Sequence, residues 1–420
     1  MKVPFKAGNI LIPKKNIDMH KWSVVACDQY TSEPEYWEEV NNIVGDSPST
    51  LNLTLPEIYL EDSNVEDRIK KINSNMKDML DNNIFDEYKD SMIYVERTQS
   101  DGKVREGLMG IVDLLDYSYE KGSTTLIRAT EKTVIERIPP RMKVRENALL
   151  ELPHIMILID DDKKEIIETL KNKVTQDDVV YDFDLMQNGG HIKGYLLNND
   201  SINDITKGLE KLMDKDNFEK KYGVHDLGVL LFAMGDGNHS LATAKACYEK
   251  LKETLSEEEY LNSPARYALV ELVNLHSDAL EFEAIHRVVF DTDVHDLLEK
   301  LYQYYNINED GNGQKFELIT KDYDKILYIE NPKSNIAVGS IQSFLDDYLS
   351  NNKGKIDYIH GEDVTKELGS KDNNIGFIFD PMAKEDLFKT VILDGALPRK
   401  TFSMGHSYDK RFYLEARKIK

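Results

Sequence analysis

Cysteine is scarce in this chain, with only Cys27 and Cys247 among its 420 residues. The two lie far apart and form no C-x-x-C pair, so neither a disulfide framework nor a cysteine-based zinc site is expected. Cys247 falls near the apolar stripe of a predicted helix and is expected in the core. For Cys27, in the segment VVACDQY, a packing role and a reactive thiol both stay open.

Basic residues are also in deficit, with 53 Lys and Arg against 76 Asp and Glu and a formal net charge of -23. A nucleic-acid backbone is polyanionic and rewards clustered basic side chains. A broad nucleic-acid-binding face is therefore excluded, and no nucleic-acid partner is expected. The acidity is instead typical of a soluble cytosolic protein.

Long apolar runs are missing as well. No stretch approaches the ~20 apolar residues that a membrane helix needs. The N-terminal segment MKVPFKAGNILIPKK has no long apolar core before a cleavage site. We therefore expect a cytoplasmic protein with no membrane partner.

Short strand patterns alternate with helical patterns along the whole chain and predict a mixed α/β (α+β) fold. The length allows two or three domains. We expect a mixed α/β domain over residues 1–115, a core domain over 116–300 and a second mixed domain over 301–420. Within them, a hairpin is predicted around Asp101-Gly102, and charged helical connectors are predicted across 160–220.

The densest chemistry lies in the turn Gly235-Asp236-Gly237-Asn238-His239. An apolar run at 228–234 predicts a buried strand before it, and Leu241, Ala244, Tyr248 and Leu251 follow at helical spacing. The glycines permit a positive φ and close approach of a ligand. The free amides of the helix N-terminus favour an anion, most naturally phosphate.

Asp236 repels a bare anion, so its place beside a phosphate site indicates either a divalent cation between them or a role as a base. The Walker spacing is absent, and Lys245 lies inside the helix. A structural alternative stays open: Asn238 or Ser240 caps the helix and His239 is an ordinary surface group.

A local surplus of positive charge marks residues 128–146, which carry Arg128, Lys132, Arg137, Arg141, Lys143 and Arg145 against three acidic residues. The planar guanidinium suits phosphate or carboxylate. The alternative is a solvated helix face broken at Pro139-Pro140. Glu131 lies among these cations, which would keep it ionised and able to accept a proton.

Two further sites of interest lie toward the C-terminus. His286 and Arg287 interrupt an otherwise apolar strand, and because strand residues alternate, at most one faces a given pocket without a bulge. Either residue can serve a structural hydrogen bond or a ligand. Lys400, in the segment Pro398–Phe402, either closes a site from a second domain or lies in an exposed loop.

Together these motifs resemble domain-of-unknown-function family 1015, a widespread bacterial and archaeal group sometimes labelled SpoOJ/ParB-like. The resemblance runs over nearly the whole chain and is carried by the segments DGKVREGLMGIVDLLDY, RATEKT, GDGNH, IHRVV and LPRKTF. The central motifs are also similar to those of the ParB/sulfiredoxin-like superfamily, which includes free-serine kinases with an Asp-Gly-His-His-Arg phosphate loop and an upstream catalytic glutamate. The resemblance thus implies a ParB/sulfiredoxin-like core with flanking mixed α/β units.

Residue by residue, the resemblance places Asp236, Gly237 and His239 on the phosphate loop and Glu131 on the catalytic glutamate. The chain departs from the pattern at two positions, because Asn238 stands for the first histidine and Ser240 for the arginine. A cation expected at the phosphates is therefore missing. The absence of cysteine at position 238 argues against sulfinic-acid chemistry.

The preferred interpretation is a nucleotide-dependent phosphotransferase that acts on the hydroxyl of a small amino acid, with L-serine as the expected acceptor. Its expected cofactors are ATP or ADP and Mg²⁺. The expected catalytic residues are Glu131, Asp236 and His239, with Asp236 also engaging the metal. Phosphate or nucleotide is expected at Gly235, Gly237, Asn238, Ser240, Arg128, Arg137 and Arg141, and the substrate at Arg145, His286, Arg287 and Lys400.

Two other classes of protein stay open. One is a ParB-like nucleotide-dependent binding or switch protein, which the low pI and the lack of a legible helix-turn-helix disfavour. The other is a hydrolase of a phosphorylated metabolite such as phosphoserine. A homodimer is one expected assembly.

Overall fold

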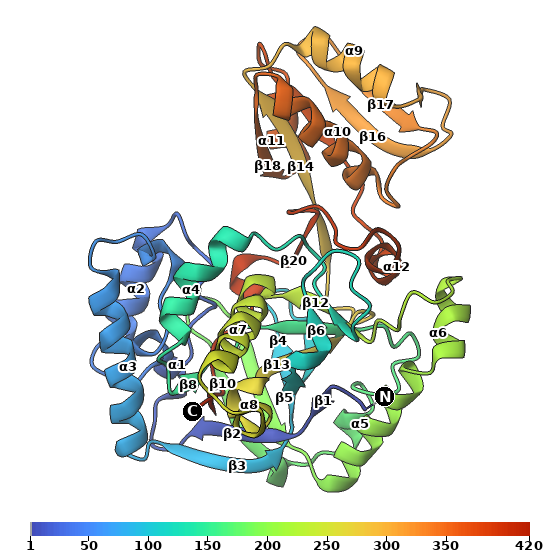
Figure 1. Cartoon of the computed structure of the whole chain (residues 1–420). Coiled ribbons are helices and arrows are strands. Elements are labelled where there is room, and N and C mark those ends of the chain that lie inside the picture. The colour runs from blue at the N-terminus through green and yellow to red at the C-terminus, as the bar shows by residue number, and fades with distance from the viewer. Residues whose placement is uncertain (1) are drawn as a thin grey trace. The chain divides into compact units, whose positions relative to one another are not determined.

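The computed structural model describes residues 2–420 and divides the chain into two compact units (Figure 1). The first unit contains the residues up to Ala129, Thr133–Leu280 and His406–Lys420. The second contains Thr130–Lys132 and Glu281–Gly405. The chain therefore leaves the first unit near residue 280 and returns to it for its last segment.

The first unit is built on a mixed ten-stranded sheet in the order β10-β11-β4-β5-β13-β9-β12-β7-β6, with β1 paired to β5. Its strands are β1 (Phe5–Lys6), β4 (Ile93–Thr98), β5 (Val104–Asp113), β6 (Tyr117–Ser118), β7 (Ile127–Arg128), β9 (Met156–Ile159), β10 (Val179–Asp184), β11 (His191–Leu196), β12 (Phe232–Asp236) and β13 (Tyr267–Asn274). Two small sheets pair β2 (Gly8–Pro13) with β3 (Phe85–Ser91) and β8 (Leu150–Glu151) with β21 (Arg417–Lys418). The sheet combines strands from residues 1–115 with strands from residues 116–280, so both parts of the chain contribute to one sheet.

The described part of the first unit also contains eight α-helices. They are α1 (Met19–Trp22), α2 (Pro34–Val44), α3 (Val65–Asp81), α4 (Ile138–Arg145), α5 (Asn199–Leu212), α6 (Lys215–Tyr222), α7 (Asn238–Lys250) and α8 (Glu257–Asn262). Pro34 opens α2 at a position where its missing N–H costs no helical bond. Pro139 and Pro140 likewise lie in the first turn of α4 and begin the helix instead of breaking it.

Two local predictions need correction. The segment 160–220 was expected to be helical, yet it includes the antiparallel pair β10–β11 as well as α5 and α6. A turn with positive φ at Gln187, Asn188 and Gly190 joins those strands. The strand before the glycine turn covers Phe232–Asp236, later than the expected 228–234.

The C-terminal segment of the first unit packs in the core of that unit. Val25 pairs with Phe412 and Leu11 pairs with Ala416 as isolated antiparallel bridges. Phe412 belongs to a hydrophobic cluster with Val25 and Trp37. Residues near the N-terminus are therefore held in place by residues from the other end of the chain.

The second unit is a sheet with four helices of its own (Figure 1). The order is β15-β17-β16-β19-β14-β18, with β20 paired to β14. The strands are β14 (Phe282–Phe290), β15 (Ile307–Asn308), β16 (Gln314–Ile319), β17 (Asp324–Ile329), β18 (Lys355–His360), β19 (Ile375–Ile378) and β20 (Phe402–Met404), and the helices are α9 (Val294–Tyr304), α10 (Ala337–Asn351), α11 (Glu362–Gly369) and α12 (Lys384–Asp394). The mixed α/β fold predicted from the sequence is thus confirmed in both units. Over residues 2–420, no helix combines the length and apolarity that a bilayer crossing needs.

Candidate functional site

The glycine turn joins β12 directly to α7. Gly237 is the N-cap residue of α7, with φ 76°, and a Cβ there would lie 3.1 Å from the Ile155 Cα. Only glycine meets both demands without strain. The first hydrogen bond inside α7 runs from the Leu241 N–H to the Gly237 carbonyl at 3.0 Å, so the amides of residues 238–240 have no acceptor within the helix. These amides form the positive end of a 13-residue helix.

Asp236 ends β12 with a lysine beside it. Its Oδ2 lies 3.3 Å from the Lys410 Nζ, and its Oδ1 accepts the Gly237 N–H at 2.8 Å. Burial favours the protonated acid, but Lys410, His154 and the Gly237 amide outweigh burial and hold the pKa of Asp236 below its usual range. Asp236 is therefore ionised, and Lys410 reaches it from the returning C-terminal segment.

His239 is a neutral imidazole in this environment. Burial, followed by the nearby charges of Arg141 and Arg137, lowers the pKa of His239 to about 4. The Val134 N–H donates to the His239 Nε2 at 3.3 Å, so the neutral ring carries its proton on Nδ1. At neutral pH the side chain can therefore donate one hydrogen bond from Nδ1.

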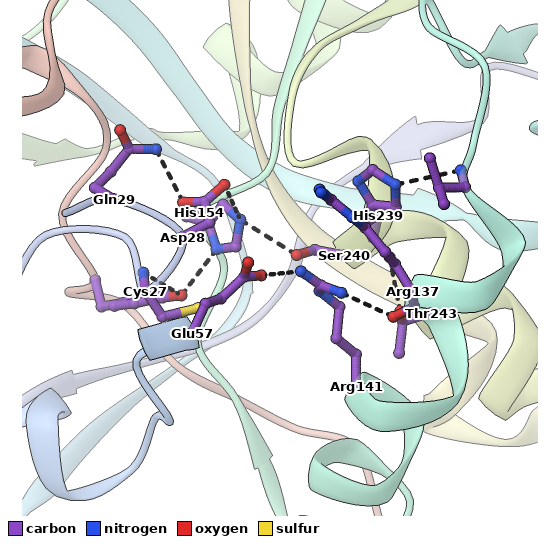
Figure 2. A network of polar contacts seen from close by, with 12 residues as sticks. Cys27, Asp28, Gln29, Glu57, Arg137, Arg141, His154, His239, Ser240 and Thr243 are labelled. Atoms are coloured by element: carbon purple, nitrogen blue, oxygen red, sulfur yellow. Dashed lines mark hydrogen bonds and ion pairs between the residues drawn. The ribbon is translucent and has the colours of Figure 1, made fainter. Parts of the chain in front are cut away.

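Two arginines of the basic stretch lie near His239. Figure 2 shows Arg137 beside the imidazole and Arg141 directed toward Glu57. Arg141 forms an ion pair with Glu57, and its Nη1 donates to the Arg137 carbonyl at 2.8 Å. Arg137 is exposed, so its guanidinium is accessible to a ligand.

A cavity of about 150 Å³ opens beside the first turns of α7. Its apolar lining comes from Leu53, Leu55, Leu60, Met76, Val144, Ala148, Leu150, Leu152, Pro153 and Ile155. Its polar lining comes from Cys27, Thr54, Glu57, Arg141, Arg145, Glu151, His154, Ser240, Thr243 and Tyr413. Such a combination of apolar walls and a few convergent polar groups is typical of a small-molecule site.

Ser240, His154 and Tyr413 form a hydrogen-bonded chain at this cavity (Figure 2). The Ser240 Oγ lies 3.2 Å from the His154 Nε2, and the His154 Nδ1 lies 2.9 Å from the Tyr413 Oη. The Asp28 Oδ2 lies 3.7 Å from the same Nε2. The site thus gathers residues from both ends of the chain and from its middle.

Two other arginines that were assigned to ligands have protein partners. Arg128 is buried and donates to backbone carbonyls, including those of Thr125 at 2.8 Å and Gly228 at 2.9 Å. Its guanidinium is committed to these carbonyls and fixes the segment that leads into β12. Arg145 forms an ion pair with the buried Glu151 at the cavity wall.

The remaining predicted residues, Glu131, His286, Arg287 and Lys400, belong to the second unit. Glu131 forms a parallel bridge with Leu397. Arg287 is fully buried and donates to the Lys400 carbonyl at 2.8 Å and to the Gln342 Oε1 at 3.0 Å. The expected site residues are therefore divided between the two units.

His286 is also committed to a contact inside the second unit. It is buried and accepts the Phe379 N–H at 3.3 Å through Nδ1. The side chains of His286 and Arg287 thus both have structural hydrogen bonds, which was one of the two alternatives for this pair.

The residues present do not form a metal site by themselves. Across the described residues 2–420, no group of three or more His, Cys, Asp and Glu side chains is placed to hold a metal ion. Both carboxylate oxygens of Asp236 already have partners, Lys410 and the Gly237 amide. Magnesium at Asp236 stays a prediction.

Several residues of this site were not predicted from the sequence. His154, Tyr413, Asp28, Glu57 and Lys410 all contact it or line its cavity. A polar residue directly before a buried strand, as in HIMILID, and the acidic residue in VVACDQY were the available signals. Neither signal shows that the two segments meet.

Comparison with known proteins places the chain in a family. Residues 11–348 match the model of the protein family of unknown function DUF1015, so the chain belongs to this family, as its motifs indicated. No curated protein matches the chain.

Several solved structures are similar to this chain at low identity. A free serine kinase in complex with AMP matches at 11% identity and a TM-score of 0.39, covering 74% of this chain and 92% of that one. A conserved hypothetical protein from Pyrococcus furiosus matches at 12% identity and a TM-score of 0.37, with 76% and 96% covered. SbnI from Staphylococcus aureus, with a C-terminal truncation, matches at 9% identity and a TM-score of 0.37, with 71% and 82% covered.

Proposed function

We propose that this protein is a phosphotransferase that transfers a phosphoryl group from ATP or ADP to the hydroxyl of a small amino acid, with L-serine as the preferred acceptor. The observation that carries the proposal is the junction of β12 and α7. There, amides that have no acceptor within the helix, a neutral histidine and nearby cations lie beside a cavity with apolar walls. Phosphoryl transfer requires mainly positioning and charge neutralisation, which such a junction can supply.

The first turn of α7 would hold the phosphates of the nucleotide. Its amides point outward from the helix end, and Gly237 leaves the backbone open to close approach. His239 would donate its Nδ1–H to a phosphate oxygen. A neutral donor suits this task because it does not depend on protonation near neutral pH.

Arg137, Arg141 and Lys410 would supply the positive charge that the loop arginine of the resembling kinases provides. Ser240 occupies the position of that arginine and carries no charge. Arg137 and Arg141 act electrostatically on His239, which places them near the turn, and Lys410 is held at the turn by Asp236. A guanidinium that binds phosphate through two donors would add directional hydrogen bonds to this charge.

Glu131 would accept the proton of the acceptor hydroxyl, as the resemblance implies. It precedes Val134, the hydrogen-bond donor to His239, by three residues in the chain. Magnesium would enter with the nucleotide, with Asp236 as its protein ligand. Both assignments are proposals that site variants can test.

Ligand binding at the turn can be measured by thermal unfolding. We expect ATP, ADP or inorganic phosphate to raise the melting temperature, because a ligand at a hundredfold excess over its Kd stabilises the fold by about 2.7 kcal/mol. Arg137→Gln should weaken nucleotide binding about tenfold or more, since hydrogen bonds to charged groups contribute about 1.5–3 kcal/mol. Lys143→Gln removes the same charge from an exposed position of α4 and serves as the control. If ATP, ADP and inorganic phosphate all leave the melting temperature unchanged, the proposed phosphate site would be contradicted.

The protonation state of His239 gives a separate prediction. Its folded pKa of about 4 lies below the ordinary value of 6.5, so the unfolded chain binds the extra proton between these values. Stability from this residue is therefore present above pH 6.5 and declines as pH falls toward 4. In ¹⁵N-detected NMR of the imidazole, we expect an Nδ1–H tautomer that stays neutral down to about pH 5. A midpoint near 6.5 would contradict the assigned role.

A further inference from the structure

Ser240 lies within hydrogen-bond reach of a buried histidine. Its Oγ is 3.2 Å from the His154 Nε2, and only 6% of His154 is exposed. Ser240 also lines the cavity of about 150 Å³ beside α7. Its hydroxyl can therefore meet a ligand in the cavity and a proton acceptor at the same time.

The other side of His154 is oriented by a tyrosine. The His154 Nδ1 lies 2.9 Å from the Oη of the buried Tyr413, whose oxygen also accepts the Cys27 N–H at 3.2 Å. When the Nδ1–H of His154 donates to Tyr413, the Nε2 lone pair is directed to Ser240. The Asp28 carboxylate, 3.7 Å from Nε2, would stabilise the imidazolium that forms on proton transfer.

Nucleophilic catalysis requires a nucleophile, a base within hydrogen-bond distance of it and a third group that orients the base. From this geometry we propose that Ser240 takes the phosphoryl group from the nucleotide and forms a phosphoserine enzyme, with His154 as its base. This inference rests on the proposed function, whose phosphate site is the same turn. The reaction would then run in two displacements through a covalent intermediate.

The atoms of both displacements balance. The Ser240 Oγ attacks the terminal phosphorus, its proton passes to the His154 Nε2, and the bond from phosphorus to the leaving oxygen of the nucleotide breaks. In the second displacement the acceptor hydroxyl attacks the same phosphorus and loses its proton to the base that serves the acceptor. The Ser240 oxygen leaves and regains its proton from the His154 imidazolium.

The surroundings of Ser240 favour a phosphoryl group over a neutral acyl group. Ser240 is the third residue of α7, within the turn whose amides have no acceptor in the helix. Arg137 and Arg141 add positive charge at the same helix end. The helix amides and the arginines both stabilise a dianionic phosphoryl group, whereas they stabilise a neutral ester little.

The test is to trap the intermediate on the full-length protein without an acceptor. With ATP labelled at the γ-phosphate, or ADP labelled at the β-phosphate, we expect an acid-stable, alkali-labile label that peptide mass mapping assigns to Ser240. Ser240→Ala should abolish the label. His154→Gln should slow labelling about 10²-fold or more, as expected for loss of a general base. Ser350→Ala, which removes an exposed hydroxyl of α10 in the second unit, should leave labelling unchanged.

Tyr413 is a positioning residue in this scheme and needs a readout of its own. Tyr413→Phe removes the acceptor of the His154 Nδ1–H, so the imidazolium should become less stable. The acid limb of the pH profile for labelling should then move to lower pH. An unchanged profile would leave Tyr413 as a packing residue.

The outcomes separate this inference from the proposed function. Phosphoserine production by the wild type, with no label on Ser240 and full turnover by Ser240→Ala, would overturn the intermediate and leave the phosphotransferase intact. An acid-labile label on a histidine would also overturn it. If neither ATP nor ADP binds, acetyl phosphate is used as the phosphoryl donor. Labelling of Ser240 by acetyl phosphate would support Ser240 as the nucleophile and contradict the nucleotide as the donor. No labelling of Ser240 by acetyl phosphate would contradict both the nucleophile and the donor.

Discussion

A Glu131→Gln variant should lose about 10²–10⁴-fold in turnover of amino acid to phosphorylated product while it keeps its nucleotide affinity. Glutamine keeps the shape and most of the hydrogen bonding of glutamate but cannot accept the proton. We assign Glu131 this role because its motif resembles that of the kinases with a catalytic glutamate, and Glu131 lies within the basic stretch 128–146. The loss should therefore fall on the chemical step and not on binding.

Steady-state kinetics and nucleotide titration on the same preparation measure the two effects. Glu136→Gln is the matched control, because it makes the same substitution at an exposed position of the same segment. The phosphoserine enzyme should still form in Glu131→Gln, since His154 serves that displacement. Near-normal turnover by a folded Glu131→Gln protein would make Glu131 a structural residue.

An Arg411→Met variant should lose about 3–5 kcal/mol of unfolding free energy, the usual effect of removing one partner from a buried ion pair. Arg411 forms ion pairs with Glu271 and Glu415, and at most 2% of any of these three side chains is exposed. Although burial disfavours its charge, the two carboxylates raise the pKa of Arg411 above its usual value. Methionine would leave these carboxylates in the core with less compensation.

Urea denaturation gives this free energy directly. Lys418→Met is the control, because the Lys418 to Glu87 pair spans 3.5 Å at a partly exposed site and should contribute at most about 1 kcal/mol. Arg411 lies between Lys410 and Tyr413 along the returning segment, so its loss should also weaken phosphate binding. An Arg411→Met protein within about 1 kcal/mol of the wild type would show that this segment is not held by its buried charges.

The sequence predicted the elements whose signals are local. The hairpin of β4 and β5 closes at Asp101-Gly102, where Gly102 has φ 84°. The glycine turn leads from a buried strand into a helix, as the apolar run and the helical spacing indicated. In each of these cases a few neighbouring residues carry the whole signal.

The rest depends on contacts between distant segments. Nothing near Lys410 or Tyr413 in the sequence indicates that they meet Asp236 and His154, which lie 174 and 259 residues away. The pair β10–β11 is not predicted from the sequence, because charged residues alternate with apolar ones in a pattern that a charged helical connector also shows. The grouping into two units was not predicted for the same reason, since the chain leaves the first unit and returns to it at its end.

Mass spectrometry of the reaction products tests the central claim most directly. Purified full-length protein would be incubated with ATP or ADP, with and without Mg²⁺, and with a panel of amino acids that includes serine, threonine and alanine. We predict a product heavier by one phosphoryl group from a hydroxyl amino acid, with serine preferred and alanine inert, and loss of the product in Glu131→Gln. No phosphorylated amino acid with either nucleotide, from protein that binds the nucleotide, would contradict the phosphotransferase assignment.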